Sequence, residues 1–148
     1  MRTFTRGVAP ILVCLAVALR GAAAEEGPAQ WLARIFDPAT MLLEPFPGAQ
    51  LNRKLSTDAI ALERGGTKQI AVFIIPLDQI KAAADHYAKQ FGAEGQILGA
   101  DSPFEMHVFD FTRADAVARF KGLRVQISRS PFVDNKGEIK MEYQPPAK

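Results

Sequence analysis

The clearest pattern of hydrophobic and polar positions runs from Ile70 to Gly92. Six consecutive apolar residues end at Ile75, and most of them are β-branched or aromatic, which predicts a strand that is buried on both faces. Pro76 lacks a backbone N–H and ends this strand. The apolar residues that follow recur every three or four positions as far as Phe91, which predicts a long amphipathic helix that stops at Gly92. We expect the rest of the domain to fold around this strand and this helix.

A hairpin is predicted immediately before the buried strand. Residues 58–64 alternate between apolar side chains and polar or small ones, and Gly65 and Gly66 follow at once. Two adjacent glycines suit a tight turn, because both can adopt a positive φ. We therefore expect residues 58–64 to pair with the strand that ends at Ile75.

A second hairpin is predicted at the C-terminal end of the chain. Residues 123–128 alternate between apolar and polar side chains, and the same alternation returns in residues 138–143. Pairing apolar residues on the same face sets Arg124 opposite Glu142 as a favourable cross-strand charge pair. A slip of two residues would preserve both faces but lose this pair, so it is the alternative register.

Three further elements complete the expected fold. Residues 29–36 have one-sided helical spacing and predict a short helix, residues 104–111 predict an aromatic-rich strand, and residues 112–122 predict another short helix. Residues 92–103 are rich in glycine and predict a loop. The order of elements predicts an α+β fold, in which a mainly antiparallel sheet is packed by one long amphipathic helix, with a short N-terminal helix and a C-terminal β-hairpin.

The first 24 residues have the layout of a secretory signal peptide. Arg2 and Arg6 supply a positive start, an apolar block of 12 residues runs from Val8 to Leu19, and the small residues Ala22 to Ala24 precede Glu25. The apolar block is shorter than the roughly 20 residues that a spanning helix needs, so we expect no spanning membrane segment in the mature chain.

Cleavage before Glu25 divides the chain into three parts. Residues 1–24 are the secretory signal peptide, residues 25–48 contain the N-terminal helix and a Pro-rich connector, and residues 49–146 form a single α+β domain. The expected location of the mature protein is the periplasm or the medium.

Removing the signal peptide changes the charge of the chain. The 18 Lys and Arg and 16 Asp and Glu of the full chain become 15 and 16, because three arginines leave with the signal, and the formal net charge falls from +2 to −1. A nearly neutral chain has no general attraction for nucleic acid, so no nucleic-acid partner is expected. Cys14 also leaves, so the mature protein is expected to be disulfide-free and to depend on its hydrophobic core.

Glu105 and His107 are the best-placed pair for catalytic chemistry. They share the parity of the aromatic-rich strand, so their side chains are expected on the same side of the sheet. The mature chain has no cysteine, no serine in a G-x-S-x-G elbow and no tight metal-ligand motif such as H-E-x-x-H. We therefore expect no cofactor and no metal site, and a small exported enzyme centred on the Glu105/His107 side of the sheet is the alternative interpretation.

A strand that is apolar on both faces sets a packing problem, because one helix can cover only one face. Phe73 and Ile75 share one face of the buried strand, and Phe109 and Phe111 share a parity in the aromatic-rich strand. We predict that these four residues, with Trp31, form a ligand or partner face. The N-terminal helix, a homodimer partner and an apolar small molecule are the three alternatives for its cover.

Positive charge is concentrated toward the C-terminus. Residues 113–148 hold eight Lys and Arg against four Asp and Glu, whereas residues 25–112 hold seven against twelve. Ordinary surface variation that is complemented within the fold explains this asymmetry, and the alternative is a basic edge that meets an anionic envelope component or partner. Its residues are Arg119, Lys121, Arg124, Arg129 and Lys136.

The export signal and the lack of a catalytic motif together favour one class of function. We expect an exported, non-catalytic binding or interaction module of the bacterial-type cell envelope, with a ligand that the sequence does not identify.

Mass spectrometry of the protein recovered from the periplasm or the medium tests the export signal. The expected chain begins at Glu25, because Ala22 to Ala24 provide the small residues that signal cleavage requires. Intact Met1 in the cytoplasmic fraction would contradict the prediction.

Overall fold

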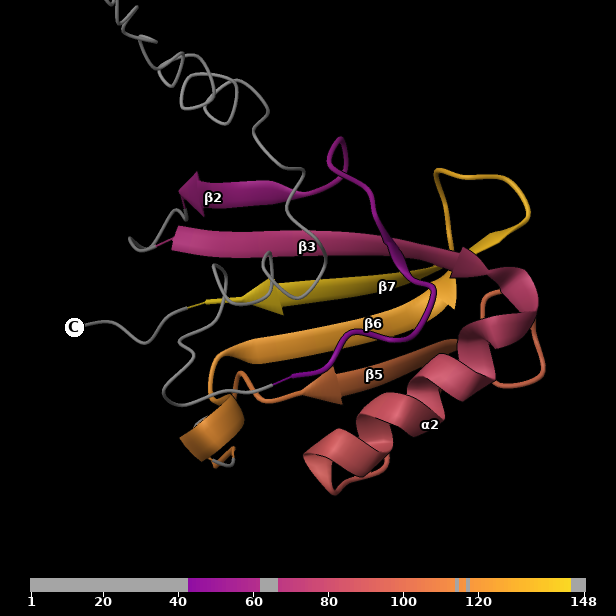
Figure 1. The fold of residues 1–148 in the computed structure, drawn as a ribbon. Coiled ribbons are helices and arrows are strands. Elements are labelled where there is room, and N and C mark those ends of the chain that lie inside the picture. The colour runs from indigo at the N-terminus through magenta and orange to yellow at the C-terminus, as the bar shows by residue number, and fades with distance from the viewer. Residues whose placement is uncertain (1–42, 62–66, 114, 117, 145–148) are drawn as a thin grey trace, which may run out of the picture.

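The computed structural model describes residues 43–61, 67–113, 115–116 and 118–144 (Figure 1). Within these residues the fold is mixed α+β, with an antiparallel sheet packed by one α-helix, as the sequence predicts. The expected signal peptide, the N-terminal helix at residues 29–36 and the turn at Gly65 lie outside the described residues.

β3 (Thr67–Pro76) is the longest strand of the sheet, and it pairs antiparallel with β7 (Lys136–Tyr143). The sheet continues through β6 (Leu123–Arg129) and β5 (Met106–Asp110) to β4 (Gln96–Leu98), and these neighbours also pair antiparallel. β3 is thus an inner strand of the sheet, because β1 and β2 occupy its other edge. The predicted burial on both faces is only partial, since Ile70 and Ile74 are half-buried.

The other edge of β3 is occupied by two short strands. β1 (Gln50–Leu51) pairs with the second half of β3, and β2 (Thr57–Ala61) pairs with the first half. Between them the chain leaves the sheet, but the Asn52 N–H donates to the Val72 carbonyl oxygen at 2.8 Å and the Val72 N–H donates to Ser56 Oγ at 2.9 Å. These bonds hold residues 52–56 against the edge of β3.

The structure corrects the predicted long helix. α2 (Ile80–Phe91) has 12 residues, because the first expected turn forms a 3₁₀ turn, η2 (Leu77–Gln79). Gly92 ends α2 as predicted, with a φ of 64° in the left-handed region that favours glycine.

Two further expectations are corrected. Residues 92–103, expected to be a loop, contain β4, because the free edge of β5 offers backbone partners to a stretch without a strand pattern of its own. In residues 112–122, the described part contains only a 3₁₀ turn, η3 (Ala118–Phe120).

The C-terminal strands pair in the register expected from their alternation, with Arg124 opposite Glu142. The predicted charge pair is nevertheless wrong in its partners. Glu142 is bound by Lys140 at 2.7 Å and by Lys68 of β3 at 2.8 Å, whereas Arg124 lies 4.0 Å from Asp110 of β5. Lys140 lies in β7 itself, two residues from Glu142, and Lys68 lies in β3, outside the hairpin. Both reach the carboxylate, which the cross-strand pairing of one hairpin does not predict.

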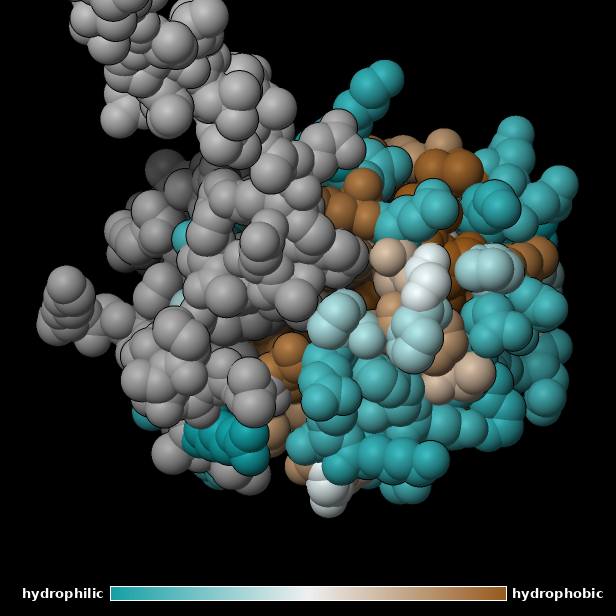
Figure 2. Space-filling model, in the orientation of Figure 1, coloured by the Kyte–Doolittle hydropathy of each residue, from teal (hydrophilic) through white to brown (hydrophobic). Residues whose placement is uncertain are grey.

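The hydrophobic core lies between α2 and one face of the sheet. Phe91 is at its centre, with ring centroids 4.9 Å from Phe111 and Phe120 and 5.1 Å from Phe109. The cluster also contains Ala71, Phe73, Ile75, Leu123, Val125, Ile127, Ile139 and Met141 from the strands and Ala83, Ala84 and Tyr87 from α2. The outer surface of α2 is hydrophilic in Figure 2, at the lower right of the view.

Residues 43–48, expected to belong to the connector, pack with Ala49 onto α2 and the core (Figure 1). The Glu44 N–H donates to Gln90 Oε1 at 2.7 Å, and Gln90 Nε2 donates to the Glu44 carbonyl oxygen at 3.0 Å. The Phe46 N–H donates to the Tyr87 hydroxyl at 3.2 Å, while burial raises the pKa of Tyr87 well above its usual value. This segment therefore extends the cover of the core beyond α2.

Substitution of a core aromatic residue tests this packing. Phe73 is 1% exposed, so Phe73→Ala is expected to lower the free energy of unfolding by about 3–5 kcal/mol in urea denaturation. Phe104→Ala is the matched control, because Phe104 is 83% exposed, and it is expected to change stability by less than about 0.5 kcal/mol. Equal losses in the two variants would show that Phe73 is not in the core.

Candidate functional site

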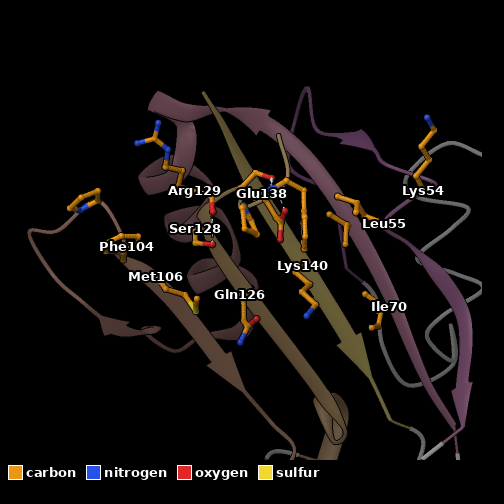
Figure 3. Close-up of a pocket in the computed structure, with 15 residues that line it drawn as sticks. Lys54, Leu55, Ile70, Phe104, Met106, Gln126, Ser128, Arg129, Glu138 and Lys140 are labelled. Carbon is orange, nitrogen blue, oxygen red and sulfur yellow. Dashed lines mark hydrogen bonds between the residues drawn. The ribbon is translucent and has the colours of Figure 1, made fainter. Parts of the chain in front are cut away.

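The face of the sheet opposite α2 carries a groove with a cavity volume of about 700 Å³ (Figure 3). Its floor is formed by β3, β7, β6 and β5, and its rims by residues 54–55, residues 103–104 and residues 130–132. The lining residues are Lys54, Leu55, Ile70, Val72, Pro103, Phe104, Met106, Gln126, Ser128, Arg129, Ser130, Pro131, Phe132, Glu138 and Lys140.

The apolar residues of the groove floor lie on the two strands that flank β7 and β6 on this face. Ile70 and Val72 belong to β3, and Met106 belongs to β5. Figure 3 shows Ile70 and Met106 on either side of the floor. At the rims, Phe104 is 83% exposed and Phe132 is 72% exposed. Two large aromatic side chains that remain in water beside an apolar floor are typical of a binding surface rather than of a core.

The polar part of the groove is organised by Glu138 of β7, which is only 6% exposed. Ser130 Oγ donates to Glu138 Oε2 at 2.9 Å and accepts the N–H groups of Phe132 at 3.3 Å and Val133 at 3.1 Å. Ser130 thus connects the β6–β7 loop to the floor of the groove.

Lysine and glutamate side chains form an ion-pair cluster on the same face. Lys140 Nζ lies 2.7 Å from Glu142 Oε1, and Lys68 Nζ lies 2.8 Å from Glu142 Oε2. Partial burial by itself raises the pKa of Glu142, but hydrogen bonds and attraction from both lysines outweigh burial and hold this pKa below its usual value. Lys140 is therefore held in an ion pair, but Glu142 is shared with Lys68 and the cluster keeps a net positive charge.

The predicted ligand or partner face is on the wrong side of the sheet. Phe73, Ile75 and Phe109 are 1–3% exposed within the core, and Phe111 packs against that core. Trp31 lies outside the described residues. The apolar residues of β6 and β7 share a face with Phe73 through the β3–β7 register, and α2 covers this larger apolar face.

Glu105 and His107 meet as expected, on the α2 side of the sheet. His107 Nε2 lies 3.0 Å from Glu105 Oε1, and Glu105 Oε2 accepts the Asp101 N–H at 3.2 Å. His107 is 8% exposed and pairs with Ile127, whose side chain is in the core. This pair links β5 to the loop before it, and neither residue lines the groove.

The expected basic edge is not one edge in the structure. Arg119, Lys121 and Arg124 lie at or before the start of β6, whereas Arg129 and Lys136 lie at its far end and at the start of β7. β6 is paired on both sides, so it is an inner strand. Only Arg129 of the five lines the groove.

In the described part of the chain, no cluster of three or more His, Cys, Asp or Glu residues is arranged to hold a metal ion. The same residues include no helix that is long and apolar enough to cross a membrane.

Sequence reasoning missed the residues that define the groove, above all Glu138, Ser130 and Phe132. Glu138 alternates with apolar residues in β7 and therefore resembles any exposed strand residue. One signal was present: the β6–β7 loop carries an aromatic residue, Phe132, which a plain surface turn does not need.

Comparison of this chain with models of protein families, with curated proteins and with solved structures finds no match. The geometry of the groove is therefore the basis on which a function is inferred.

The pH dependence of stability tests the ion-pair cluster. The pKa of Glu142 is lower in the folded protein than in the unfolded chain, so the ionised carboxylate stabilises the folded state. This stabilisation is complete above the unfolded pKa of about 4.3 and is lost as the pH falls through the folded pKa. Glu142→Gln is therefore expected to be less stable than the native protein at neutral pH, and the difference should shrink at lower pH. Urea unfolding over a pH series measures it, with Glu94→Gln as the exposed control. A difference that stays constant with pH would refute this role for Glu142.

Proposed function

We propose that this chain is an exported, non-catalytic binding module of the bacterial-type cell envelope. Its groove on the open face of the sheet binds an apolar or amphipathic small molecule. The observation that carries the proposal is the cavity of about 700 Å³ in the described face, which falls within the size range of small-molecule sites. The export signal at residues 1–24 supports the envelope location.

The composition of the groove favours such a ligand. Its floor combines Ile70, Val72 and Met106 with a small number of polar side chains, which is the usual arrangement in a site that holds an apolar body and orients it. Phe104 and Phe132 extend the apolar surface at the rims, where a bound molecule would remove both rings from water.

The groove supports binding better than the Glu105–His107 pair supports catalysis. His107 is 8% exposed and its bond to Glu105 is accounted for by the attachment of the loop at Asp101. Among the lining residues, Ser128 and Ser130 carry the only hydroxyl groups. Ser128 Oγ donates to the Arg129 carbonyl oxygen, and the Ser130–Glu138 bond is accounted for by the attachment of the β6–β7 loop. The small exported enzyme is therefore the weaker interpretation.

Titration of the purified mature protein with Nile red, a neutral apolar dye, tests the groove. Saturable binding of one dye per chain is expected. Met106→Glu places a charge on the apolar floor and should weaken binding at least about tenfold, which corresponds to about 1.4 kcal/mol. Ile97→Glu is the matched control, because Ile97 is 52% exposed but does not line the groove.

Two results would contradict the proposal. Equal dye binding by the two variants would place the dye elsewhere on the protein. A native mass of two chains that returns to one chain in Met106→Glu would show that a second copy of the protein occupies this face.

A further inference from the structure

Glu138 presents one carboxylate oxygen to the groove without a donor from the described part of the protein. The side chain lines the groove, yet it is only 6% exposed (Figure 3). Oε2 accepts the hydrogen bond from Ser130 Oγ at 2.9 Å. Among the described residues, no hydrogen bond reaches Oε1, and Oε1 is not among the fully buried atoms that lack a partner, so it stays accessible from the groove. A ligand that fills the groove removes this oxygen from water, which is costly unless the ligand supplies a donor.

Ser130 cannot serve Oε1 as well. A hydroxyl group has one proton, and that of Ser130 is used for Oε2, while the Ser130 oxygen accepts the N–H groups of Phe132 and Val133. Ser130 therefore holds the carboxyl group in a fixed orientation.

The cations of the groove are weaker competitors for a ligand than their number implies. Lys140 Nζ is already held 2.7 Å from Glu142, which limits its access to a ligand, although Glu142 is shared with Lys68 and the cluster keeps a net positive charge. Lys54 and Arg129 are exposed, so water and salt screen them. Glu138 is the most buried charged side chain of the lining, and an interaction with it is the least screened.

We propose that the polar end of the ligand is a hydrogen-bond donor, best an ammonium group, that binds Oε1 of Glu138. The apolar part of the ligand then lies along the floor over Val72 and Met106. The ligand class is an amphipathic amine, and this inference rests on the proposed binding function of the groove. A charge-assisted bond from an ammonium group is stronger than one from a neutral donor, which gives the order of preference amine, alcohol, carboxylate.

Displacement of Nile red by three molecules with the same alkyl chain tests the inference. Octylamine, octanol and octanoate are compared at neutral pH, below the concentrations at which they form micelles. Octylamine is expected to displace the dye at about tenfold lower concentration than octanoate, with octanol between them. In Glu138→Gln, this preference should fall to within about twofold when each displacement is scaled to the affinity of that variant for Nile red.

Ser130→Ala separates ligand recognition from loop attachment. This variant removes the bond between the loop and Glu138 but keeps the carboxyl group, so it should retain most of the preference for octylamine. An equal loss of preference in both variants would show that Glu138 acts only through the loop. A native protein that prefers octanoate would overturn the inference and assign recognition to the cations. Failure of the native protein to bind Nile red at all would instead refute the proposed function of the groove.

Discussion

The structure depends on one constraint: strands present side chains alternately to two faces, and a single helix covers only one face. α2 lies over the face that carries Phe73, Val125 and Met141, where the apolar residues of β3, β6 and β7 coincide through their register. Residues 43–49 complete that cover beside α2. In the described part of the chain, the opposite face is left to form the groove.

The open face is tolerable in water because its centre is polar. Gln126 and Ser128 of β6 and Lys140 of β7 lie between the apolar residues of β3 and β5. Residues 54–55, 103–104 and 130–132 lie beside these apolar residues and form the rims of the groove (Figure 3). The groove is therefore a consequence of sheet composition: on this face, the apolar residues of β3 and β5 flank the polar residues of β7 and β6, which lie between them.

The polar interactions of this face have two separate roles. The Glu142 cluster joins β3 to β7 and adds to stability. The contact of Ser130 with Glu138 joins the β6–β7 loop, which carries Phe132, to the floor. A ligand that binds Glu138 therefore meets a carboxyl group and an aromatic rim whose positions are set by the same hydroxyl group.

The sequence by itself determined those elements whose pattern is local. Six apolar residues ending at Ile75, the helical spacing up to Phe91, and the matched alternation that sets Arg124 opposite Glu142 each depend on residues close together or joined by one turn. The choice of the face under α2 was decided only by the tertiary structure, and the predicted ligand face around Phe73 was wrong for that reason. The face depends on the pairing of β3 with β7, whose partners lie 60 to 74 residues apart and share no local signal. The short strand β4 and the surroundings of Glu138 depend in the same way on neighbours that are distant in the chain.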